Sequence, residues 1–597
     1  MREGAVLADD LPPLLARLDA RAAVLEARSL RLSRIRLGTA LGGAVRALVL
    51  GNVVGPWSGW IAVAATLAVF AVLVKIHERV EAALTRLKLW RTLRARDLAR
   101  IRRDWPTLGP APAPPPPGHA YASDLDVVGP RSLLHLLDTT ATEAGHERLR
   151  DWLLGEEPDD ADARQPLVRA LVPRRRFRQR LALLGHEAGG GADQRWDDAP
   201  VHAWLTEPPD RSLYVWAAIL GALAATTAVL VGVDVAGGPR WWGASFALYV
   251  VLTLWKYASV ATVFERAYDL QRAVKQVASV LRFVEADPTG RLPALAPLWE
   301  PFRDERAPSR RLDRLRRIVG AAAVTRNEVG RVVFNAILPY DFLLSIALDR
   351  LRGDLAGLFE PWIDALADVE ALSALAAFAD RQPDATFPDL ADDGPLFDAR
   401  DLRHPLLADA VGNDVALAPG GVLLMTGSNM SGKSTFLRSV GLASVLATAG
   451  GPVTARALAL RPLRPVTSMR IGDVLQEGLS TFYAEVRRLR TLLDAVEADG
   501  PPALVLIDEM LRGTNNRERL AGAQGVVRAL AGADATSLVA THDLALADLE
   551  GEDARIRNAH FRETAEGDRL VFDYRLREGP CPTTNALVIM RRAGLPV

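Results

Sequence analysis

Cysteine is almost absent from this chain of 597 residues, since Cys581 is the only one. A disulfide framework and a zinc site built from cysteines are therefore excluded, and the composition fits a reducing cytoplasm. An excess of either charge is also absent, because lysine plus arginine equals aspartate plus glutamate at 72 each. No basic field covers the whole chain, so contact with nucleic acid would depend on local patches. Residues 1–30 are charged and lack the apolar core of a cleavable signal peptide, and no internal repeat is evident.

Long apolar segments are abundant, and hydrophobic residues make up 49% of the chain. The segments form two pairs, each divided by a short turn: 37–54 with 57–74, and 213–233 with 241–255. A helix that crosses a bilayer needs about 20 apolar residues. The second and third segments meet this requirement, whereas Arg46 interrupts the first and the fourth is short.

These segments have two interpretations, as buried helices of a large soluble core or as two membrane hairpins. Tryptophans at the segment ends and basic residues outside each pair favour hairpins, because aromatic side chains concentrate at membrane interfaces and Lys and Arg remain on the cytoplasmic side. The residues concerned are Trp57, Trp60, Trp241, Trp242 and Trp255, with Arg31, Arg34, Arg36, Lys75, Arg79, Arg211, Lys256 and Arg266. Both turns are then expected outside an inner or plasma membrane, with the rest of the chain, including its C-terminal domain, in the cytoplasm.

The segments between and after the hairpins favour helices, with leucine, alanine and arginine at helical spacing up to about residue 380. The basic stretch 85–103 is expected to lie against anionic lipid headgroups rather than DNA. Residues 106–118 form a proline-rich, extended linker. Two further basic runs, 173–180 and 309–317, are either exposed helix faces or sites of contact with nucleic acid.

A glycine-rich segment near the C-terminus has the spacing and context of a P-loop. The apolar strand 421–426 leads into it and a helical pattern follows it. The candidate nucleotide-binding residues are Gly427, Ser428, Asn429, Met430, Ser431, Gly432, Lys433, Ser434 and Thr435. Glycines let successive N–H groups point at phosphate oxygens, and the helix presents its positive end to the same anion. Lys433 is expected to reach the β- and γ-phosphates of ATP, and Ser434 to bind Mg²⁺.

Two more apolar strands end at polar residues suited to the same site. The strand 503–507 leads to Asp508, a candidate Mg²⁺ ligand, and to Glu509, the candidate general base for the attacking water. The strand 537–540 leads to His542, which is either an ordinary polar residue or a contact to the γ-phosphate. Because ligands bind at the carboxyl ends of strands in open α/β sheets, the three motifs together predict a catalytic site of Lys433, Glu509 and His542.

These motifs resemble the MutS family. The loop 427–435, the segment 480–486 (STFYAEV), the box 507–515 (IDEMLRGTN) and Ala-Thr-His at 540–542 are similar to that family's signatures, as is Arg-His-Pro at 403–405. The resemblance is strong over about 400–597. It weakens upstream, in 125–154 and 368–378, which look like parts of the family's core and lever helices.

The resemblance implies an ABC-like α/β P-loop ATPase domain at the C-terminus, preceded by an all-α lever and core region that contains the two hairpins. It also implies a homodimer through the ATPase domains, in which Ser480 reaches the partner's γ-phosphate. On the residues alone Ser480 would be a plain N-cap. The expected segments are an N-terminal helix (1–36), hairpin 1 (37–80), the basic helix and linker (81–118), a core-like helical region (119–210), hairpin 2 (211–257), a lever-like region (258–395) and the ATPase domain (396–597).

Three functions compete at this point. The first is a membrane-tethered, DNA-binding ATPase related to mismatch repair proteins, without their mismatch-recognition domain and with weak sequence preference. The second is an ABC-like membrane ATPase that acts on a partner other than nucleic acid, although the Leu-Ser-Gly-Gly-Gln signature of transporters is missing. The third is a membrane scaffold with a degenerate nucleotide site, which the intact Lys433, Ser434, Asp508, Glu509 and His542 argue against.

Overall fold

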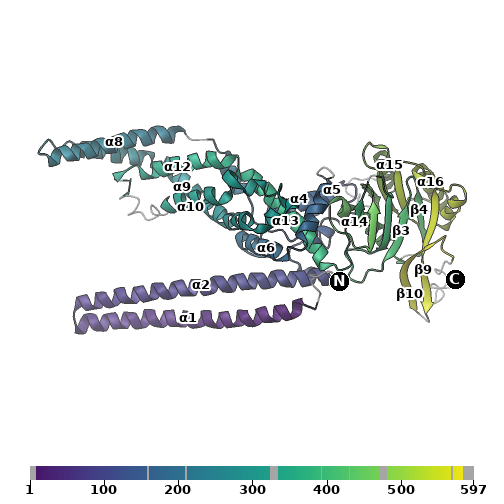
Figure 1. The fold of residues 1–597 in the computed structure, drawn as a ribbon, viewed down its shortest axis with the longest axis horizontal. Coiled ribbons are helices and arrows are strands. Elements are labelled where there is room, and N and C mark those ends of the chain that lie inside the picture. Colours follow the sequence, from purple (N-terminus) through teal and green to yellow (C-terminus); the bar gives the residue numbers. More distant parts are fainter. Residues whose placement is uncertain are drawn as a thin grey trace. The chain divides into compact units, whose positions relative to one another are not determined.

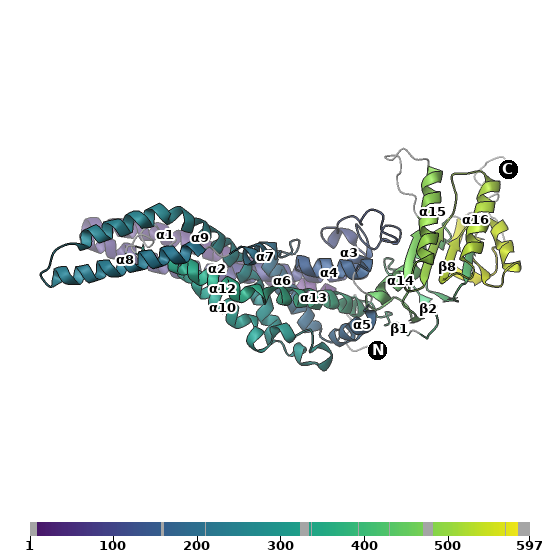
Figure 2. The ribbon, with the colours of Figure 1, turned by 90° about the horizontal axis from the view of Figure 1, so that it is seen from above.

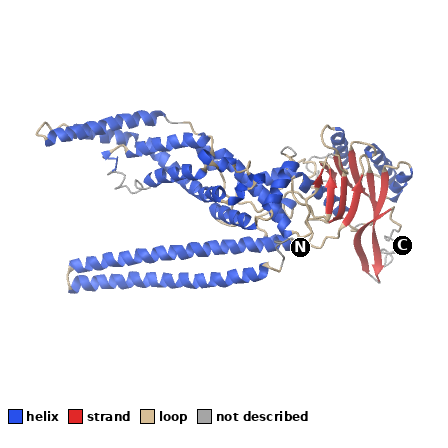
Figure 3. Ribbon diagram, in the orientation of Figure 1, coloured by secondary structure: helices blue, strands red, loops and turns tan. Residues whose placement is uncertain are grey.

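The computed structural model describes residues 9–156, 160–208, 211–322, 334–335, 337–391, 393–428, 430–469, 481–566 and 569–582. Contacts divide the chain into two compact units. Unit 1 comprises residues 1–138, 149–173 and 374–597, and unit 2 comprises residues 139–148 and 174–373. Helices occur in both units, and the described strands all belong to unit 1 (Figure 3).

Unit 1 begins with a hairpin of two long helices, α1 (Leu11–Val53) and α2 (Pro56–Arg102), which lie side by side in Figure 1 and overlap in the view from above (Figure 2). Gly55 makes the turn at a φ of +133°, and proline at the first position of α2 costs no helical hydrogen bond. The helices approach closely at Gly59, where an added Cβ would lie 3.0 Å from the Cα of Gly51. Ion pairs join the helices further from the turn, Lys88 with Glu26 and Arg91 with Asp19.

The end of α2 corrects one sequence prediction in part, because several arginines of the stretch 85–103 are buried and cannot contact lipid headgroups. Arg94, Asp97 and Arg100 are buried in unit 1. The Asp97 carboxylate pairs with Arg94 at 2.7 Å and with Arg381 at 3.0 Å, and Arg100 Nε donates to the carbonyl of Leu136 at 3.1 Å. A buried charge is stable only when it is paired, so these arginines serve internal contacts and not a surface.

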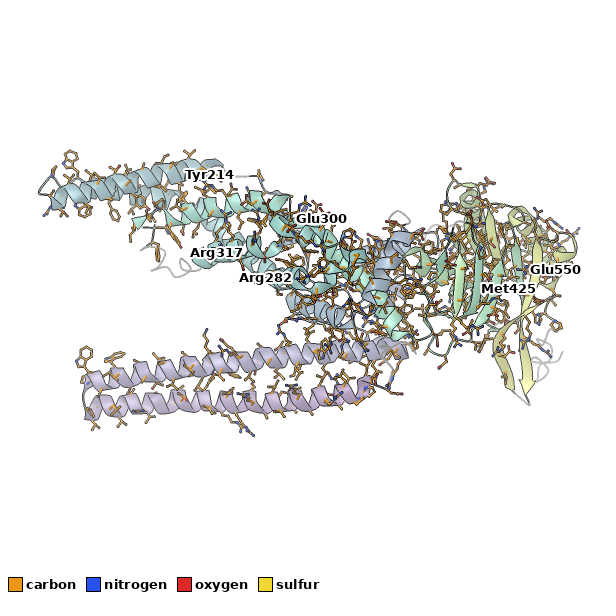
Figure 4. The ribbon with its side chains drawn as sticks, in the orientation of Figure 1. Tyr214, Arg282, Glu300, Arg317, Met425 and Glu550 are labelled. Carbon is orange, nitrogen blue, oxygen red and sulfur yellow. The ribbon has the colours of Figure 1, made fainter. Side chains whose placement is uncertain are left out.

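Unit 2 contains a second hairpin, formed by α8 (Arg211–Val235) and α9 (Trp242–Ala286). At the end far from its turn, the Lys256 ammonium lies over the rings of Trp216 and Trp255, at 4.8 and 4.7 Å from their centroids. The Tyr214 hydroxyl, labelled in Figure 4, donates to Asp349 Oδ2 at 2.8 Å and so joins α8 to α12 (Tyr340–Ala356). The other long helices here are α6 (Arg175–Gly189), α7 (Ala199–Thr206), α10 (Pro308–Ala322) and most of α13 (Phe359–Arg381).

The apolar segments are helical as predicted, and two of their helices are long and apolar enough to cross a membrane by length and composition. These are α2 and the part of α8 from Ser212 to Val235. They carry the second and third apolar segments, the two that the sequence favoured, and only 11% of each apolar window is buried. The helical hairpins are thus confirmed, whereas the membrane crossing stays a prediction.

The C-terminal part of unit 1 is a mixed α/β fold around a six-stranded sheet of order β10-β9-β4-β8-β7-β6. All neighbours are parallel except β10 and β9. The strands are β4 (Val422–Thr426), β6 (Arg464–Ser468), β7 (Ala503–Asp508), β8 (Ala535–Ala540), β9 (Ile556–Glu566) and β10 (Arg569–Glu578). Strands β4 and β8 are buried throughout, which explains their unbroken apolar sequences, and Met425 marks β4 in Figure 4.

Helices α14 (Lys433–Thr448), α15 (Thr481–Glu497) and α16 (Asn516–Leu530) pack on this sheet. A smaller sheet of order β1-β5-β2-β3 consists of β1 (Asp389–Leu390), β2 (Phe397–Leu402), β3 (Asn413–Leu417) and β5 (Ala457–Leu460). The remaining helices are α3 (Leu133–Leu137), α4 (Glu143–Leu154), α5 (Ala161–Leu171) and short 3₁₀ turns, of which η8 (Leu544–Gly551) is the longest described.

Candidate functional site

The loop 427–435 joins β4 to α14, in the strand–loop–helix order that the sequence predicts. Gly427 and Gly432 have φ angles of +147° and +109°, which side-chain-bearing residues rarely adopt. A Cβ on Gly427 would also lie 2.8 Å from the carbonyl oxygen of Phe561. The loop can therefore follow this path only with glycine at these two positions.

Lys433 is the first residue of α14 and is only 5% exposed. Its Nζ donates to the carbonyl oxygens of Gly427 and Ser428 at 2.8 and 2.7 Å. Burial lowers the pKa of Lys433, and the carboxylates of Glu509, Asp508 and Glu563 oppose that shift. The lysine thus holds a positive charge against the loop, with carboxylates around it.

Hydrogen bonds bring the ends of β4, β7 and β8 to one edge of the sheet. Asp508 is the register partner of Ala540, and Thr541 N donates to the carbonyl of Met425 at 2.9 Å. Beyond these ends, His542 Nδ1 lies 3.2 Å from Glu509 Oε1. The structure therefore places Glu509 and His542 in contact, beside the loop that carries Lys433.

Glu509 has a strained backbone, with a φ of +55°. The left-handed conformation costs a residue with a side chain about 1–2 kcal/mol and tends to persist where function requires it. The carboxylate is held on two sides, because Arg512 Nε lies 3.1 Å from Oε2 while His542 contacts Oε1. Glu485 on α15 in turn accepts from Arg512 N at 3.0 Å, so α15 supports the segment that follows Glu509.

A cavity of about 500 Å³ adjoins the loop. It is lined by Lys433, Ser434 and Glu509, and on its other walls by residues of the sheets and of the segment 402–413. Those other residues include His404, Leu407, Asn413, Phe561 and Tyr574. The cavity is comparable in size to small-molecule sites and combines polar groups with aromatic and aliphatic walls.

His404 is a neutral part of the wall at pH 7. Burial lowers its pKa to about 4, and the guanidinium groups of Arg438 and Arg103 add to the effect. Arg103, which follows α2, donates from Nε and Nη2 to the carbonyl of Pro405 at 3.0 and 2.7 Å. The residue that follows the first hairpin thus fixes the segment that forms this wall.

Sequence reasoning missed Phe561 and Tyr574, which line the cavity, and Glu563, which accepts a hydrogen bond from Ser428 of the loop. All three belong to the β9–β10 ribbon. Tyr574 lies where the register of the ribbon shifts between Phe572 and Leu576, at a φ of +54°. An added Cβ on Gly432 would lie 3.1 Å from the Tyr574 ring, so this aromatic side chain covers the loop. No short motif marks a bulge of this kind, although the strand pattern after His542 indicates that a further strand lies nearby.

The other predicted residues are distributed unevenly. Met430 is 85% exposed, whereas Ser431 is 2% exposed and its hydroxyl has no hydrogen-bond partner among the described residues. Thr435 lines the cavity, and the Ser428 hydroxyl donates to Glu563 Oε2 at 2.5 Å. Asn429 and Ser480 lie outside the described residues.

Strand, glycine-rich loop and helix beside the cavity define this part of the chain as an α/β domain with a candidate ligand site at the carboxyl edge of its sheet. Residues 423–597 match the family model of MutS domain V. Over 240 residues the chain is 37% identical to a DNA mismatch repair protein MutS of Natronomonas pharaonis, an alignment that covers 39% of this chain and 27% of that protein. The chain thus spans about a quarter of the length of this relative, and its C-terminal region is similar to MutS proteins.

Proposed function

We propose that this chain is a MutS-type ATPase that binds ATP in the cavity beside the loop 427–435. The observation that carries the proposal is that Lys433 and Ser434 of the loop motif line one cavity with Glu509, which belongs to a different motif. The buried Ser431 hydroxyl supports it, because a phosphate oxygen would supply the hydrogen-bond partner that the described residues do not. The relative's name connects it with DNA mismatch repair, which makes DNA the first candidate for a second partner.

The residues have distinct roles in this proposal. Lys433 neutralises the β- and γ-phosphates, and the N–H groups of the loop and of the first turn of α14 bind phosphate oxygens. Glu509 accepts a proton from the attacking water, and His542 orients Glu509 and contacts the γ-phosphate. The Ser434 hydroxyl and the Asp508 carboxylate fit Mg²⁺, since hard oxygen ligands are those the ion prefers. Bound there, Mg²⁺ would neutralise charge that develops on the phosphates.

The decisive test compares the purified full chain with its Lys433→Ala variant. The wild type is expected to release phosphate from ATP in the presence of Mg²⁺, whereas the variant loses the charge that binds the phosphates. Its affinity for ATP should fall by about a hundredfold or more, a loss of about 2.7 kcal/mol. Binding is measured by titration calorimetry and turnover by phosphate release.

Lys88→Ala is the matched control, because Lys88 is exposed and pairs with Glu26 at 2.7 Å. It should leave both measurements unchanged. Wild-type protein that neither binds nor hydrolyses ATP would refute the proposed function.

The proposal includes a homodimer through the ATPase domains. Apolar side chains are exposed close to the site: Met430 on the loop and Phe482, Tyr483 and Val486 on the first turns of α15. Ser480 directly precedes α15, which is consistent with a role at the partner's nucleotide. The seven-segment division of the chain, with both hairpins as membrane tethers that contact lipid, also stays part of the proposal.

DNA binding is proposed through helical arginines of unit 2. On α10, Arg310, Arg314 and Arg317 are exposed, and Arg314 pairs with Asp354 at 3.2 Å. Exposed ion pairs contribute little to stability, so such an arginine can exchange its partner for a phosphate. Contacts with the DNA backbone carry no sequence information, and we expect weak sequence preference.

We expect matched and mismatched duplexes of one length to bind equally, within threefold. The affinity should fall steeply with salt, with a slope of about −0.9 per neutralised phosphate. Arg310→Ala with Arg314→Ala should reduce that slope by about 2, whereas Arg28→Ala, on exposed α1, should not change it. Fluorescence anisotropy over a salt series measures this.

A tenfold mismatch preference would instead restore a role in mismatch recognition. Absence of DNA binding at low salt would favour the alternative function, an ABC-like membrane ATPase that acts on a partner other than nucleic acid.

A further inference from the structure

Glu563 is a buried carboxylate beside the loop 427–435, and neither the family motifs nor the proposed roles give it a function. It lies on β9 and is only 4% exposed. Its Oε2 accepts a hydrogen bond from the Ser428 hydroxyl at 2.5 Å. Because taking a carboxylate out of water is costly, a glutamate in this position calls for a physical reason.

Ser428 connects Glu563 to Lys433. The Lys433 ammonium donates to the carbonyl oxygens of Gly427 and Ser428, and the hydroxyl of the same Ser428 donates to Glu563. Glu563 is also one of three carboxylates, with Glu509 and Asp508, that act electrostatically on Lys433. Three carboxylates act on Lys433, and even with Arg512 paired to Glu509 they outnumber the two positive charges, so the place where phosphates would bind has an excess of negative charge.

Such a site discriminates between forms of the same nucleotide. The phosphate chain of free ATP is strongly anionic. Water screens charges poorly in a partly buried site, so each additional carboxylate there repels the phosphates appreciably. A divalent cation bound to the phosphates removes much of that repulsion. The repulsion from Glu563 therefore weakens the binding of cation-free nucleotide more than the binding of nucleotide with its cation.

We propose that Glu563 is a specificity-determining residue that makes nucleotide binding depend on a divalent cation, an inference that rests on the proposed ATPase function. Its hydrogen bond with Ser428 has a separate task, which is to anchor the first turn of the loop to β9. The two tasks can be separated by substitution. Glu563→Gln keeps a hydrogen-bond acceptor and removes the charge, whereas Ser428→Ala keeps the charge and removes the hydrogen bond.

The experiment measures the affinity of the full chain in detergent for AMP-PNP, a non-hydrolysable ATP analogue, by calorimetry. Each protein is titrated once with EDTA and once with excess Mg²⁺. Glu563→Gln is expected to tighten binding in EDTA about tenfold and binding in Mg²⁺ by less than about threefold, as the loss of one like charge predicts. Ser428→Ala should keep the wild-type ratio of the two dissociation constants.

Glu550→Gln is the matched control. Glu550, labelled in Figure 4, also accepts hydrogen bonds from β9, from Asn558 N at 3.1 Å and Asn558 Nδ2 at 2.8 Å, but it is not one of the carboxylates that act electrostatically on Lys433. It should show the wild-type ratio. If Glu563→Gln does not fold, the double variant Ser428→Ala, Glu563→Ala leaves neither partner unsatisfied and carries the same expectation.

Two outcomes would overturn the inference while the proposed function stands. One is that, in EDTA, Glu563→Gln binds AMP-PNP within twofold of the wild-type affinity, or more weakly than wild type. The other is a loss of cation dependence in Ser428→Ala equal to that in Glu563→Gln, which would assign the effect to the anchored loop. A wild-type chain that binds no AMP-PNP in either condition would refute the proposed function, and this inference with it.

Discussion

Glu509→Gln is expected to lower the rate of ATP hydrolysis by about 10²- to 10⁴-fold, the range that a positioned general base contributes. The affinity for ATP should stay within about threefold of wild type. Glutamine keeps the shape of the side chain and its contact with Arg512 and His542, but it cannot accept a proton from water. Single-turnover phosphate release, with binding measured in parallel, separates the two quantities.

The strained φ of +55° at Glu509 gives this prediction a structural basis. The segment after β7 holds the carboxylate at a fixed place beside the cavity at an energetic cost, which suits a residue that must meet a water molecule. Glu552→Gln provides the control, because Glu552 pairs with Arg528 at 2.8 Å on the surface and should have no effect. Hydrolysis by Glu509→Gln at the wild-type rate would show that the base has been assigned wrongly.

The strand–loop–helix at the site could be predicted from sequence because its determinants are local. The apolar run of β4, the glycines at 427 and 432 and the helix that begins at Lys433 are adjacent in the chain. The convergence of Lys433 and Glu509 could also be expected, since parallel strands end at one edge of a sheet. The structure adds the cavity that they share.

The parts of the structure that the sequence could not predict depend on contacts between distant residues. Asp97 and Arg381 pair across 284 positions, and this pairing belongs to an ion cluster that buries part of a basic stretch resembling a lipid-binding face. Ser428 and Glu563 are 135 positions apart, and neither is informative alone. Charge patterning along a helix reports how many charges are present but not which of them find partners.

The two hairpins show a different limit of sequence reasoning. Their helical state follows from composition, whereas a buried and a lipid-facing apolar helix share the same pattern. The structure distinguishes them in part, since the apolar side chains of the first hairpin, such as Ile61, Leu67 and Val72, are 58–70% exposed. Soluble proteins rarely expose apolar surface of this extent, so these side chains require a cover.

A bilayer would match that surface, both in the length of the apolar segment and in the residues at its ends. The segment 57–74 is about 27 Å long as a helix, close to the roughly 30 Å of a hydrocarbon core. Trp57 and Trp60 are 82% and 68% exposed at the turn, where interfacial aromatics would lie, and Lys75 follows the segment at its other end. Arg46, exposed on α1, opposes insertion by about 3 kcal/mol, which its long side chain can reduce by reaching toward the interface.

We therefore expect the full chain to remain in the membrane pellet after carbonate extraction and to enter solution only with detergent. Topology is read in a Cys581→Ser background with one new cysteine per variant. Val54→Cys, at the 68% exposed turn residue, should react with an impermeant maleimide on intact spheroplasts. Thr85→Cys, exposed on the same helix α2 but beyond its apolar segment, should react only after lysis. Recovery of the chain in the soluble fraction without detergent would exclude the tether. A hairpin that has crossed a bilayer would expose its apolar surface to water on leaving it, at a free-energy cost of about 25 cal/mol per Å².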